Sequence, residues 1–336
     1  MLKKIFKALF IALSFFVAAF GIFLAYSMQP GVSSEEFPVS EIKNFSIQNP
    51  VASGSDKLTV ISYNMGYGSG IRNNKIPIAD RAELMKNLDE MVARLGESKA
   101  DLIFLQEVDF RAHRTFDVDE MRYLAEKLGM PYGAYTLTWN KKYVAWPYWP
   151  PSSHFGRVVS GQAVLSRYPI LTQQLLEFPK PSENAFWYNW FYLDRIVQHL
   201  TLQVGDKAMS VYNVHLEAFA EESREEQLHT LQRMVKADPA SYKMVAGDFN
   251  LASQMAADAK DDDKSRDRKG LLGDFSKTTG LQDAITDPKI YSMPSWKPDK
   301  LIDHIFYSAK FHLLKSGNLS DSQASDHLAI WANLGF

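Results

Sequence analysis

Apolar residues along the chain follow two spacings, and each spacing predicts a different kind of element. Short apolar runs rich in β-branched residues predict strands at residues 58–64, 101–107, 160–169, 195–204, 208–215, 243–246, 301–307 and 325–331. Apolar residues at helical spacing predict helices at residues 81–95, 120–128 and 221–236. Strands outnumber helices and the two kinds are interspersed, which indicates a layered α/β fold.

The N-terminus has a different pattern. Lys3, Lys4 and Lys7 precede an uncharged, mostly apolar run over residues 8–27. Twenty residues of helix span about 30 Å, the thickness of the hydrocarbon core of a membrane. We therefore favour a membrane anchor over residues 1–28, with the lysines in the cytoplasm and the rest of the chain outside it. The alternative is a signal peptide cleaved near Ser27, which would make the protein secreted.

Residues 29–56 contain prolines, glycines and serines and show no strong periodicity. This composition predicts a linker, with one short strand near Phe45. Residues 57–336 then form the folded domain. A chain of this length can be a single domain when it folds as two packed sheets.

Aromatic residues are concentrated in residues 132–155, where Pro147, Pro150 and Pro151 also occur. Because proline interrupts regular structure, we expect a long aromatic loop. The loop either packs on its own side chains or faces substrate or a membrane interface, where Trp and Tyr are favoured. Trp146 and Trp149 are the candidate substrate contacts.

The composition of the chain excludes several kinds of functional site. The 336 residues are 46% hydrophobic, include no cysteine, and carry a formal net charge of −2. The absence of cysteine excludes disulfides, zinc–thiolate sites and cysteine nucleophiles. The lack of a basic excess argues weakly against a nucleic-acid partner.

Polar, ionisable residues recur at the ends of the predicted apolar strands. Any one of them would be unremarkable alone, since such residues often cap strands or turns. Strand ends meet at one rim of a layered fold, where clefts form. The residues at these ends are Asn64, Glu107, His215, Asp248, Asn250, Asp303, Asp326 and His327.

This inventory indicates hydrolysis of a phosphate ester. Glu107 offers the hard oxygen ligand that Mg²⁺ prefers. Asp248 is our candidate to orient or deprotonate the attacking water. His327, paired with Asp303, would donate a hydrogen bond to the phosphoryl oxygen. Asn64 and Asn250 can bind phosphate or water without repelling them.

The motifs also resemble a known family. They are Tyr63-Asn64, Gln106-Glu107, Asn213-Val-His215, Gly247-Asp-Phe-Asn250, Asp303-His304 and Ser325-Asp-His327, and in this order they resemble the endonuclease/exonuclease/phosphatase (DNase I-like) superfamily. The resemblance covers residues 58–336. It implies a four-layer sandwich, in which two mixed β-sheets face each other with helices outside. It also implies Mg²⁺ dependence, with Mn²⁺ as a possible substitute, and in-line attack of water at phosphorus.

The resemblance also implies residue roles. Glu107 would be the main metal ligand, assisted by Asn64 and Asp326. Asp248 and Asn250 would orient the water, His215 and His327 would contact the phosphate, and Asp303 would hold His327. Arg157 and Arg195 match no motif, so each is either a phosphate clamp or part of a structural ion pair.

The family does not specify the substrate. The anchor, the aromatic residues and the absence of a basic excess favour a phosphodiester at a membrane, such as a lipid head group. An extracytoplasmic nuclease is the second candidate, since aromatic residues can stack on bases. A catalytically dead, membrane-tethered binding protein is the third. It predicts lost motif residues, and none is missing.

Overall fold

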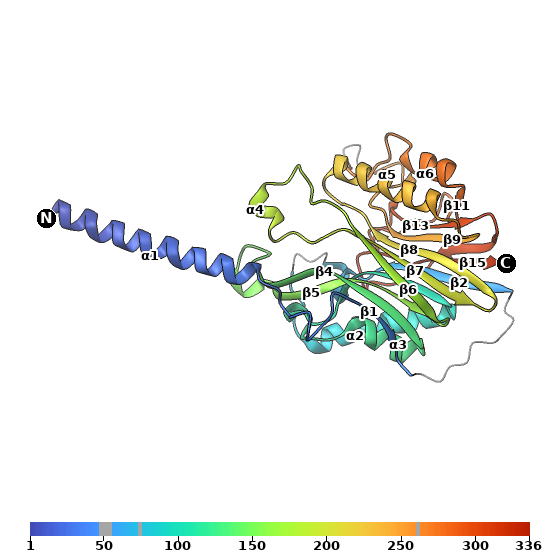
Figure 1. Cartoon of the computed structure of the whole chain (residues 1–336), viewed down its shortest axis with the longest axis horizontal. Coiled ribbons are helices and arrows are strands. Elements are labelled where there is room, and N and C mark those ends of the chain that lie inside the picture. Colours follow the sequence, from blue (N-terminus) through green and yellow to red (C-terminus); the bar gives the residue numbers. More distant parts are fainter. Residues whose placement is uncertain (47–55, 73–75, 260–262) are drawn as a thin grey trace.

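The computed structural model describes residues 1–46, 56–72, 76–259 and 263–336 and contains two large β-sheets packed face to face (Figure 1). The seven-stranded sheet has the order β1 (Ser40–Asn44), β4 (Tyr132–Val144), β5 (Gly156–Ser166), β3 (Leu102–Asp109), β2 (Lys57–Asn64), β15 (Ile330–Gly335) and β14 (His312–Asn318). The six-stranded sheet has the order β11 (Leu281–Asp283), β13 (Asp303–Ser308), β9 (Tyr242–Asp248), β8 (Lys207–His215), β7 (Ile196–Val204) and β6 (Ile170–Glu177). A small ladder joins β10 (Gln254–Met255) to β12 (Lys300–Leu301).

Helices cover the outer faces of both sheets. Helices α2 (Arg81–Ser98) and α3 (Glu120–Leu128) pack on the seven-stranded sheet, and α5 (Glu221–Ala237) and α6 (Leu271–Thr279) pack on the six-stranded sheet. Each large sheet mixes parallel and antiparallel neighbours, because β2–β3 and β8–β9 are the parallel pairs. The predicted four-layer sandwich of two mixed sheets flanked by helices is therefore confirmed.

The apolar runs form strands because both faces of each central strand are buried. In β2, Leu58 and Val60 pack in the core between the two sheets, whereas Ile61 and Tyr63 pack under α2. Side chains of a strand alternate between its faces, so a continuous apolar run supplies two cores at once. This arrangement explains why the apolar runs that predict these strands do not alternate between apolar and polar residues.

A buried network of side-chain amides crosses between the sheets. Gln106 of β3 donates from Nε2 to Asn213 Oδ1 of β8 at 2.8 Å. Asn213 Nδ2 lies 3.1 Å from Ala163 O and from Gln198 Oε1, and 3.2 Å from Leu105 O. Gln162 Nε2 donates to Asn213 O at 2.9 Å. The network fixes the position of β3 relative to β8 at a level where the core is otherwise apolar.

The prediction of a loop over residues 132–155 is wrong for its first half. Residues Tyr132–Val144 form the long strand β4, and only residues 145–155 form a loop, which includes the short helix η4 (Pro151–Ser153). All three prolines follow the strand, so they do not interrupt it. Tyr135 is fully buried and Trp139 is nearly so, as expected for aromatic residues in a strand.

The first part of the predicted linker also packs on the domain. Strand β1 pairs with β4, and Phe37 is buried in the core beneath α2 and α3. Gly31 N and Val32 N donate to Asn140 Oδ1 at 2.7 and 3.2 Å. Residues 29–46 therefore lie against the domain, because Val32 and Phe37 supply apolar side chains that a free spacer would lack. The strand expected near Phe45 is β1, which ends one residue earlier.

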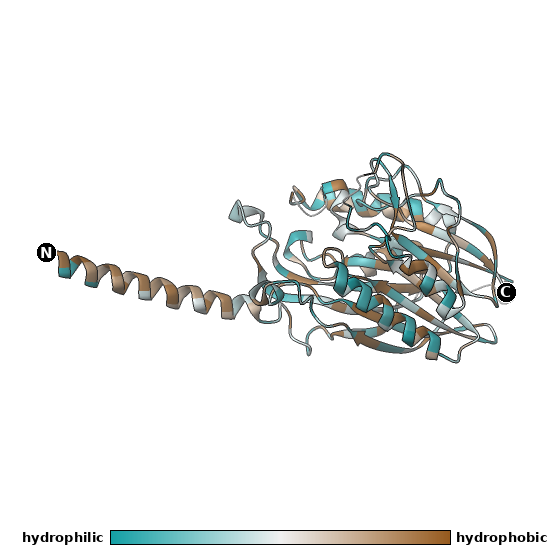
Figure 2. Cartoon of the chain, turned by 90° about the horizontal axis from the view of Figure 1, so that it is seen from above, coloured by the Kyte–Doolittle hydropathy of each residue, from teal (hydrophilic) through white to brown (hydrophobic). Residues whose placement is uncertain are grey.

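Helix α1 (Leu2–Met28) projects away from the domain and is mostly hydrophobic along its length (Figure 2), and its apolar side chains are exposed. Its length and composition suffice to cross a membrane, and a signal sequence has the same features. Its C-terminal end contacts β4, where the rings of Phe23 and Tyr143 lie 5.5 Å apart. The direction in which α1 leaves the domain is thus set by contacts with β4.

We predict that Asn213→Leu lowers the free energy of unfolding by about 3 kcal/mol, because it leaves several buried amides and carbonyls without partners. Urea denaturation followed by circular dichroism measures the change. Gln174→Leu is the matched control, because Gln174 lies in β6 and is exposed. Its effect should stay within about 0.5 kcal/mol. Equal effects of the two substitutions would contradict a stabilising role for the network.

Candidate active site

The predicted polar residues meet at one edge of the sandwich. Asn64 ends β2, Glu107 lies near the end of β3, and His215 and Asp248 end β8 and β9. The parallel pairs β2–β3 and β8–β9 place these ends at the same edge, and Asp248 is the register partner of both His215 and Asp303. Asp326 and His327 lie in the segment before β15. Within this cluster, every predicted catalytic residue except Asn250 is buried.

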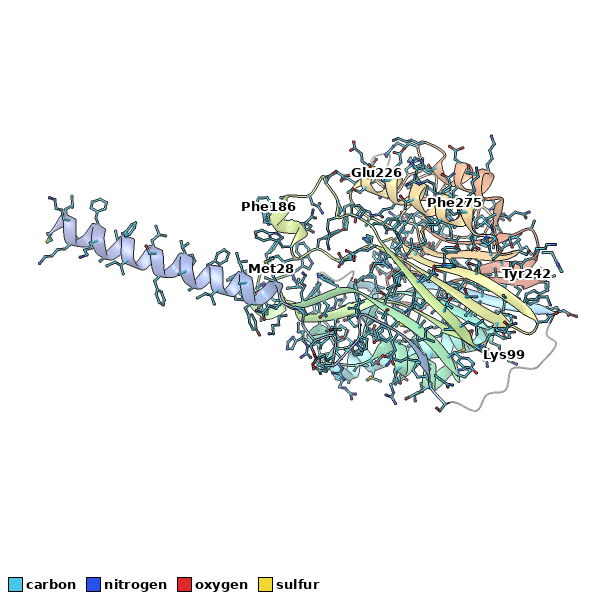
Figure 3. All side chains as sticks on the ribbon, viewed as in Figure 1. Met28, Lys99, Phe186, Glu226, Tyr242 and Phe275 are labelled. Carbon is cyan, nitrogen blue, oxygen red and sulfur yellow. The ribbon has the colours of Figure 1, made fainter. Side chains whose placement is uncertain are left out.

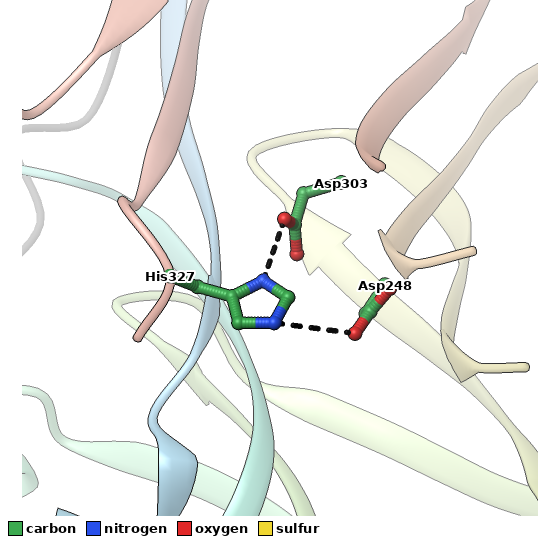
Figure 4. A group of neighbouring side chains, drawn as sticks. All are labelled: Asp248, Asp303 and His327. Atoms are coloured by element: carbon green, nitrogen blue, oxygen red, sulfur yellow. Dashed lines mark hydrogen bonds and ion pairs between the residues drawn. The ribbon is translucent and has the colours of Figure 1, made fainter. Parts of the chain in front are cut away.

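His327 lies between two aspartates (Figure 4). Its Nδ1 is 2.8 Å from Asp303 Oδ2, and its Nε2 is 3.8 Å from Asp248 Oδ2. The first contact is a hydrogen bond that orients the ring and leaves Nε2 directed at the space in front of Asp248. The pairing of His327 with Asp303 that was inferred from the sequence is present in the structure.

Asn64 connects groups of the two sheets. Its Nδ2 lies 3.3 Å from Glu107 Oε1 and 3.0 Å from Asp248 Oδ2. His215 Nε2 approaches the same two carboxylates, at 3.9 Å from Glu107 Oε1 and 3.6 Å from Asp248 Oδ2. The neutral amide of Asn64 and the imidazole of His215 therefore each contact both Glu107 and Asp248.

The carboxylates titrate unusually because they are buried next to one another. Burial, followed by the charge of Asp326, raises the pKa of Glu107 to about 7. Burial, followed by the charge of Asp303, raises the pKa of Asp248 to about 6. Such repulsion disfavours the fully ionised site unless a cation is present.

The pKa values of the two histidines shift in opposite directions. Burial alone would lower the pKa of His327, but Asp303, Asp248 and Asp326 outweigh it and raise that pKa well above 6.5. Burial, the charge of Arg195 and the charge of His327 lower the pKa of His215 well below 6.5. At neutral pH His327 is therefore a charged donor, and His215 is a neutral imidazole.

Glu107 reaches the edge through an irregularity in β3. Its φ is +52°, and the register between β3 and β5 shifts between Leu105 and Val108. A bulge of this kind redirects a side chain. Here Gln106 points into the inter-sheet network, while Glu107 points into the site. A left-handed backbone is uncommon for Glu and marks a strained position at the functional edge.

Gly247 and Asn250 shape the strand end that carries Asp248. Gly247 lies within β9 and permits close contact with β8, since a Cβ there would lie 1.9 Å from Val214 O. Asn250 has φ +50°, and its backbone N–H donates to Asp248 Oδ1 at 2.8 Å. Its Nδ2 donates to Leu216 O at 3.0 Å. The stretch is both an Asx-turn and part of the site.

Comparison with known proteins identifies the family. The model of the Endonuclease/Exonuclease/phosphatase family matches residues 61–327, a span that includes every residue of the polar edge. The chain belongs to the endonuclease/exonuclease/phosphatase family. As a member of this family it is a hydrolase that acts on phosphate esters.

Solved structures share the fold of this family member at low identity. An endonuclease/exonuclease/phosphatase from Beutenbergia cavernae is 22% identical with a TM-score of 0.60, covering 83% of this chain and 72% of that one. A mannosyl-6-phosphatase from Bacteroides thetaiotaomicron is 17% identical with a TM-score of 0.56, covering 83% and 100%. A humanized D. rerio TDP2 is 16% identical with a TM-score of 0.56, covering 84% and 100%. No curated protein matches the chain in sequence.

Two sets of ligand atoms at the edge of this family member could hold a metal ion. Asp248, Asp303 and His327 place ligand atoms within 4.8 Å of one another. However, Nδ1 of His327 is already bonded to Asp303, so this set works better as a hydrogen-bonded chain. Glu107, which is half-buried, and Asp326, which is buried, form the second set, and their charges repel each other. Carboxylates are the hard oxygen ligands that a divalent cation prefers.

The four tentative substrate contacts have different environments. Arg157 pairs with Asp117 and donates from Nε to Arg111 O, so its guanidinium belongs to a surface ion pair. Arg195 is buried, and its charge acts on His215. Trp146 and Trp149 are 39% and 80% exposed, so they lie on the surface of the loop between β4 and β5.

Sequence reasoning missed two buried groups beside the site. The Arg114 guanidinium lies 3.6 Å from the centre of the Tyr67 ring and forms a bidentate pair with Asp109 at 2.8 and 2.9 Å. Glu217 accepts from Arg195 Nε at 3.3 Å. Glu217 follows His215 by two residues on the same chain segment, and that spacing was the only signal that could have revealed it.

We predict that Gly247→Ala destabilises the protein by about 2–3 kcal/mol, because the new methyl group would push β8 away from β9. The same displacement would separate His215 from Asp248, so phosphoesterase activity should fall as well. Thermal unfolding and activity of the purified protein measure both effects. Gly273→Ala in α6 is the control, since nothing lies within 4 Å of a Cβ there. A neutral result for Gly247→Ala would contradict the close contact between the strands.

Proposed function

We propose that the protein is a Mg²⁺-dependent phosphodiesterase that acts on a phosphodiester at a membrane surface, most simply a lipid head group. One observation carries the choice of substrate. The edge of the sandwich that holds the catalytic cluster is also the edge from which the apolar helix α1 leaves (Figure 1). A membrane reached through α1 would therefore lie on the side of the active site.

The strand registers support this placement. Val108, next to Glu107, pairs with Gly161 of β5, which in turn pairs with Leu137 of β4. Strand β4 continues beyond this level to Lys142, whose N–H donates to Gln29 O at 2.7 Å directly after α1 ends. Glu107 and the base of α1 thus lie at the same end of the sheet.

Exposed aromatic residues occupy this end of the molecule. Tyr148 and Trp149 lie in the loop between β4 and β5, and Phe186 lies in α4 (Phe186–Asn189), with exposed fractions of 61%, 80% and 71%. Figure 3 places Phe186 and Met28, at the end of α1, on the same side of the domain. Tyr and Trp side chains favour the interface between lipid and water, and the ring of Phe186 adds apolar surface beside them, so these residues would stabilise contact with a bilayer.

We assign the metal to Glu107, assisted by Asn64 and Asp326, because this set brings the oxygens of two carboxylates and an amide together. Mg²⁺ is the expected ion, and Mn²⁺ can replace it at oxygen ligands. When bound, the ion would polarise the phosphoryl oxygen and neutralise the charge of the buried carboxylates. Asn64 would remain neutral and link Glu107 to Asp248 through its Nδ2.

The chain's own groups would carry the proton transfers. Asp248 accepts the proton of the attacking water as the P–O bond to the leaving alcohol breaks, and the leaving alkoxide takes a proton from solvent. The turn closed by Asn250 holds Asp248 in place. His327, charged through its contact with Asp303, donates from Nε2 to the phosphoryl oxygen as negative charge develops there. Neutral His215 contacts the phosphate without adding charge. Arg195 would clamp the phosphate, since its Nη1 has no hydrogen-bond partner among the described residues.

For location, we propose a single-pass membrane protein whose domain lies outside the cytoplasm. Lys3, Lys4 and Lys7 precede α1, and positive residues favour the cytoplasmic side. The alternative is secretion after cleavage near Ser27. Ser27 is buried against the domain, and its Oγ donates to Phe23 O at 2.7 Å.

We predict that Asp248→Asn and His327→Ala each reduce Mg²⁺-dependent phosphodiesterase activity by on the order of 10³-fold, because each removes a proton-transfer or charge-stabilising group. Initial rates with and without EDTA measure the effect, and circular dichroism checks the fold. Asp274→Asn and His229→Ala are the controls, because both residues are exposed on the outer helices. Activity retained in either site variant would contradict the mechanism.

For the substrate, we predict that the full chain in lipid nanodiscs with Mg²⁺ cleaves lipid phosphodiesters. The panel should contain sphingomyelin, phospholipids, plasmid DNA and inositol phosphates, with product release as the measurement. Asp248→Asn serves as the inactive control. Cleavage of DNA alone, with the lipids untouched, would favour the nuclease alternative. Absence of cleavage of any substrate would favour a binding protein.

A further inference from the structure

A pocket of about 310 Å³ opens beside α4, at the same end of the molecule as the catalytic edge. Four aromatic residues form most of its wall: Trp187 and Tyr188 of α4, Tyr192 after it, and Phe219 after β8. Glu183 is also part of the wall. The mechanism above does not use this pocket.

The aromatic rings enclose the pocket from different directions. The ring planes of Trp187 and Tyr188 meet at 84°, with centroids 6.3 Å apart, and the rings of Tyr188 and Tyr192 lie 5.4 Å apart at 33°. Trp187 and Phe219 are 53% and 67% exposed, so their faces are available to a ligand. Aromatic walls that meet near a right angle can present several π faces to one bound group.

The charge of the pocket is negative. Glu183 accepts hydrogen bonds from Ser223 N at 3.1 Å and from Ser223 Oγ at 2.6 Å. No lysine or arginine is among the described residues that line the pocket. A pocket for a second phosphate would need such a cation, whereas electron-rich aromatic faces and a carboxylate attract a positive ligand.

The pocket adjoins the catalytic edge through Tyr192. Its Oη donates to Glu217 Oε1 at 2.7 Å, and Glu217 Oε2 accepts from Arg195 Nε at 3.3 Å. Arg195 is the residue whose charge acts on His215. A ligand that bridges the catalytic edge and the pocket would pass beside these residues.

We infer that the pocket binds an organic cation, a quaternary or primary ammonium group, carried by the alcohol part of the phosphodiester. The inference rests on the proposed function, because it names the substrate class of the same site. The phosphate would lie at Glu107 and Asp248, and the ammonium group among the four rings and Glu183. A purely apolar ligand would gain nothing from the carboxylate.

Binding of tetramethylammonium to the full chain in detergent micelles tests the pocket directly. Saturation-transfer NMR on the methyl protons measures it without any turnover. We expect choline to bind about tenfold more tightly than 3,3-dimethyl-1-butanol, which has the same shape and no charge. Trp187→Leu and Phe219→Leu should each weaken binding of tetramethylammonium several-fold, and Tyr123→Leu on α3 should not. Equal binding of choline and its uncharged analogue, or no effect of either pocket variant, would overturn the inference.

Hydrolysis of two water-soluble diesters separates this inference from the proposed function. We expect kcat/KM to be higher for glycerophosphocholine than for glycerophosphoglycerol, and Trp187→Leu should lower that ratio about tenfold. If tetramethylammonium binds but neither these diesters nor lipid diesters are cleaved, the proposed function fails and the pocket stands. If both diesters are cleaved at equal rates and tetramethylammonium does not bind, the pocket assignment fails and the phosphodiesterase stands.

Discussion

The hydrogen bond between Gln106 and Asn213 is the contact on which the geometry of the site depends. It joins the two sheets one residue before Glu107 and two residues before His215. Apolar packing between sheets is non-directional and tolerates small sliding movements. A buried amide pair does not, because any displacement leaves its donors and acceptors unsatisfied. This hydrogen bond therefore fixes the position of Glu107, on one sheet, relative to His215, on the other.

Given that register, the chemistry of the site follows from the charged groups that surround each histidine. His327 faces Asp303 and Asp248 and takes the positive charge. His215 faces Arg195 as well as carboxylates, and it stays neutral. The site thus contains one charged and one neutral imidazole a short distance apart. The two histidines therefore carry different charges at the same pH.

Much of the fold and the polar edge could be predicted from the sequence, because both depend on local patterns. Apolar runs predicted most of the central strands, but β6 and β14 were not predicted, and the strand expected at residues 325–331 is β15 (Ile330–Gly335). The polar residues at or beside one end of these strands came together at one edge. β4 was missed because the prolines after Val144 were read as part of the same segment as Tyr132. Arg114 and Glu217 were missed because their roles depend on partners such as Tyr67 and Arg195, and no spacing rule connects them. The close approach of β8 to Gly247 could not be predicted from the sequence either, since it depends on how the two strands pack.

The junction between α1 and β4 bears on how such an enzyme would meet its substrate. Gln29 and Gly31 are hydrogen-bonded to β4 directly after the helix, so no free tether separates the helix from the domain. With α1 in a bilayer, the catalytic edge could reach only the leaflet beside it. Encounters would then occur by lateral diffusion in two dimensions. The rate would follow the mole fraction of substrate in that leaflet, and diluting the substrate with inert lipid would slow turnover even when its total amount is unchanged.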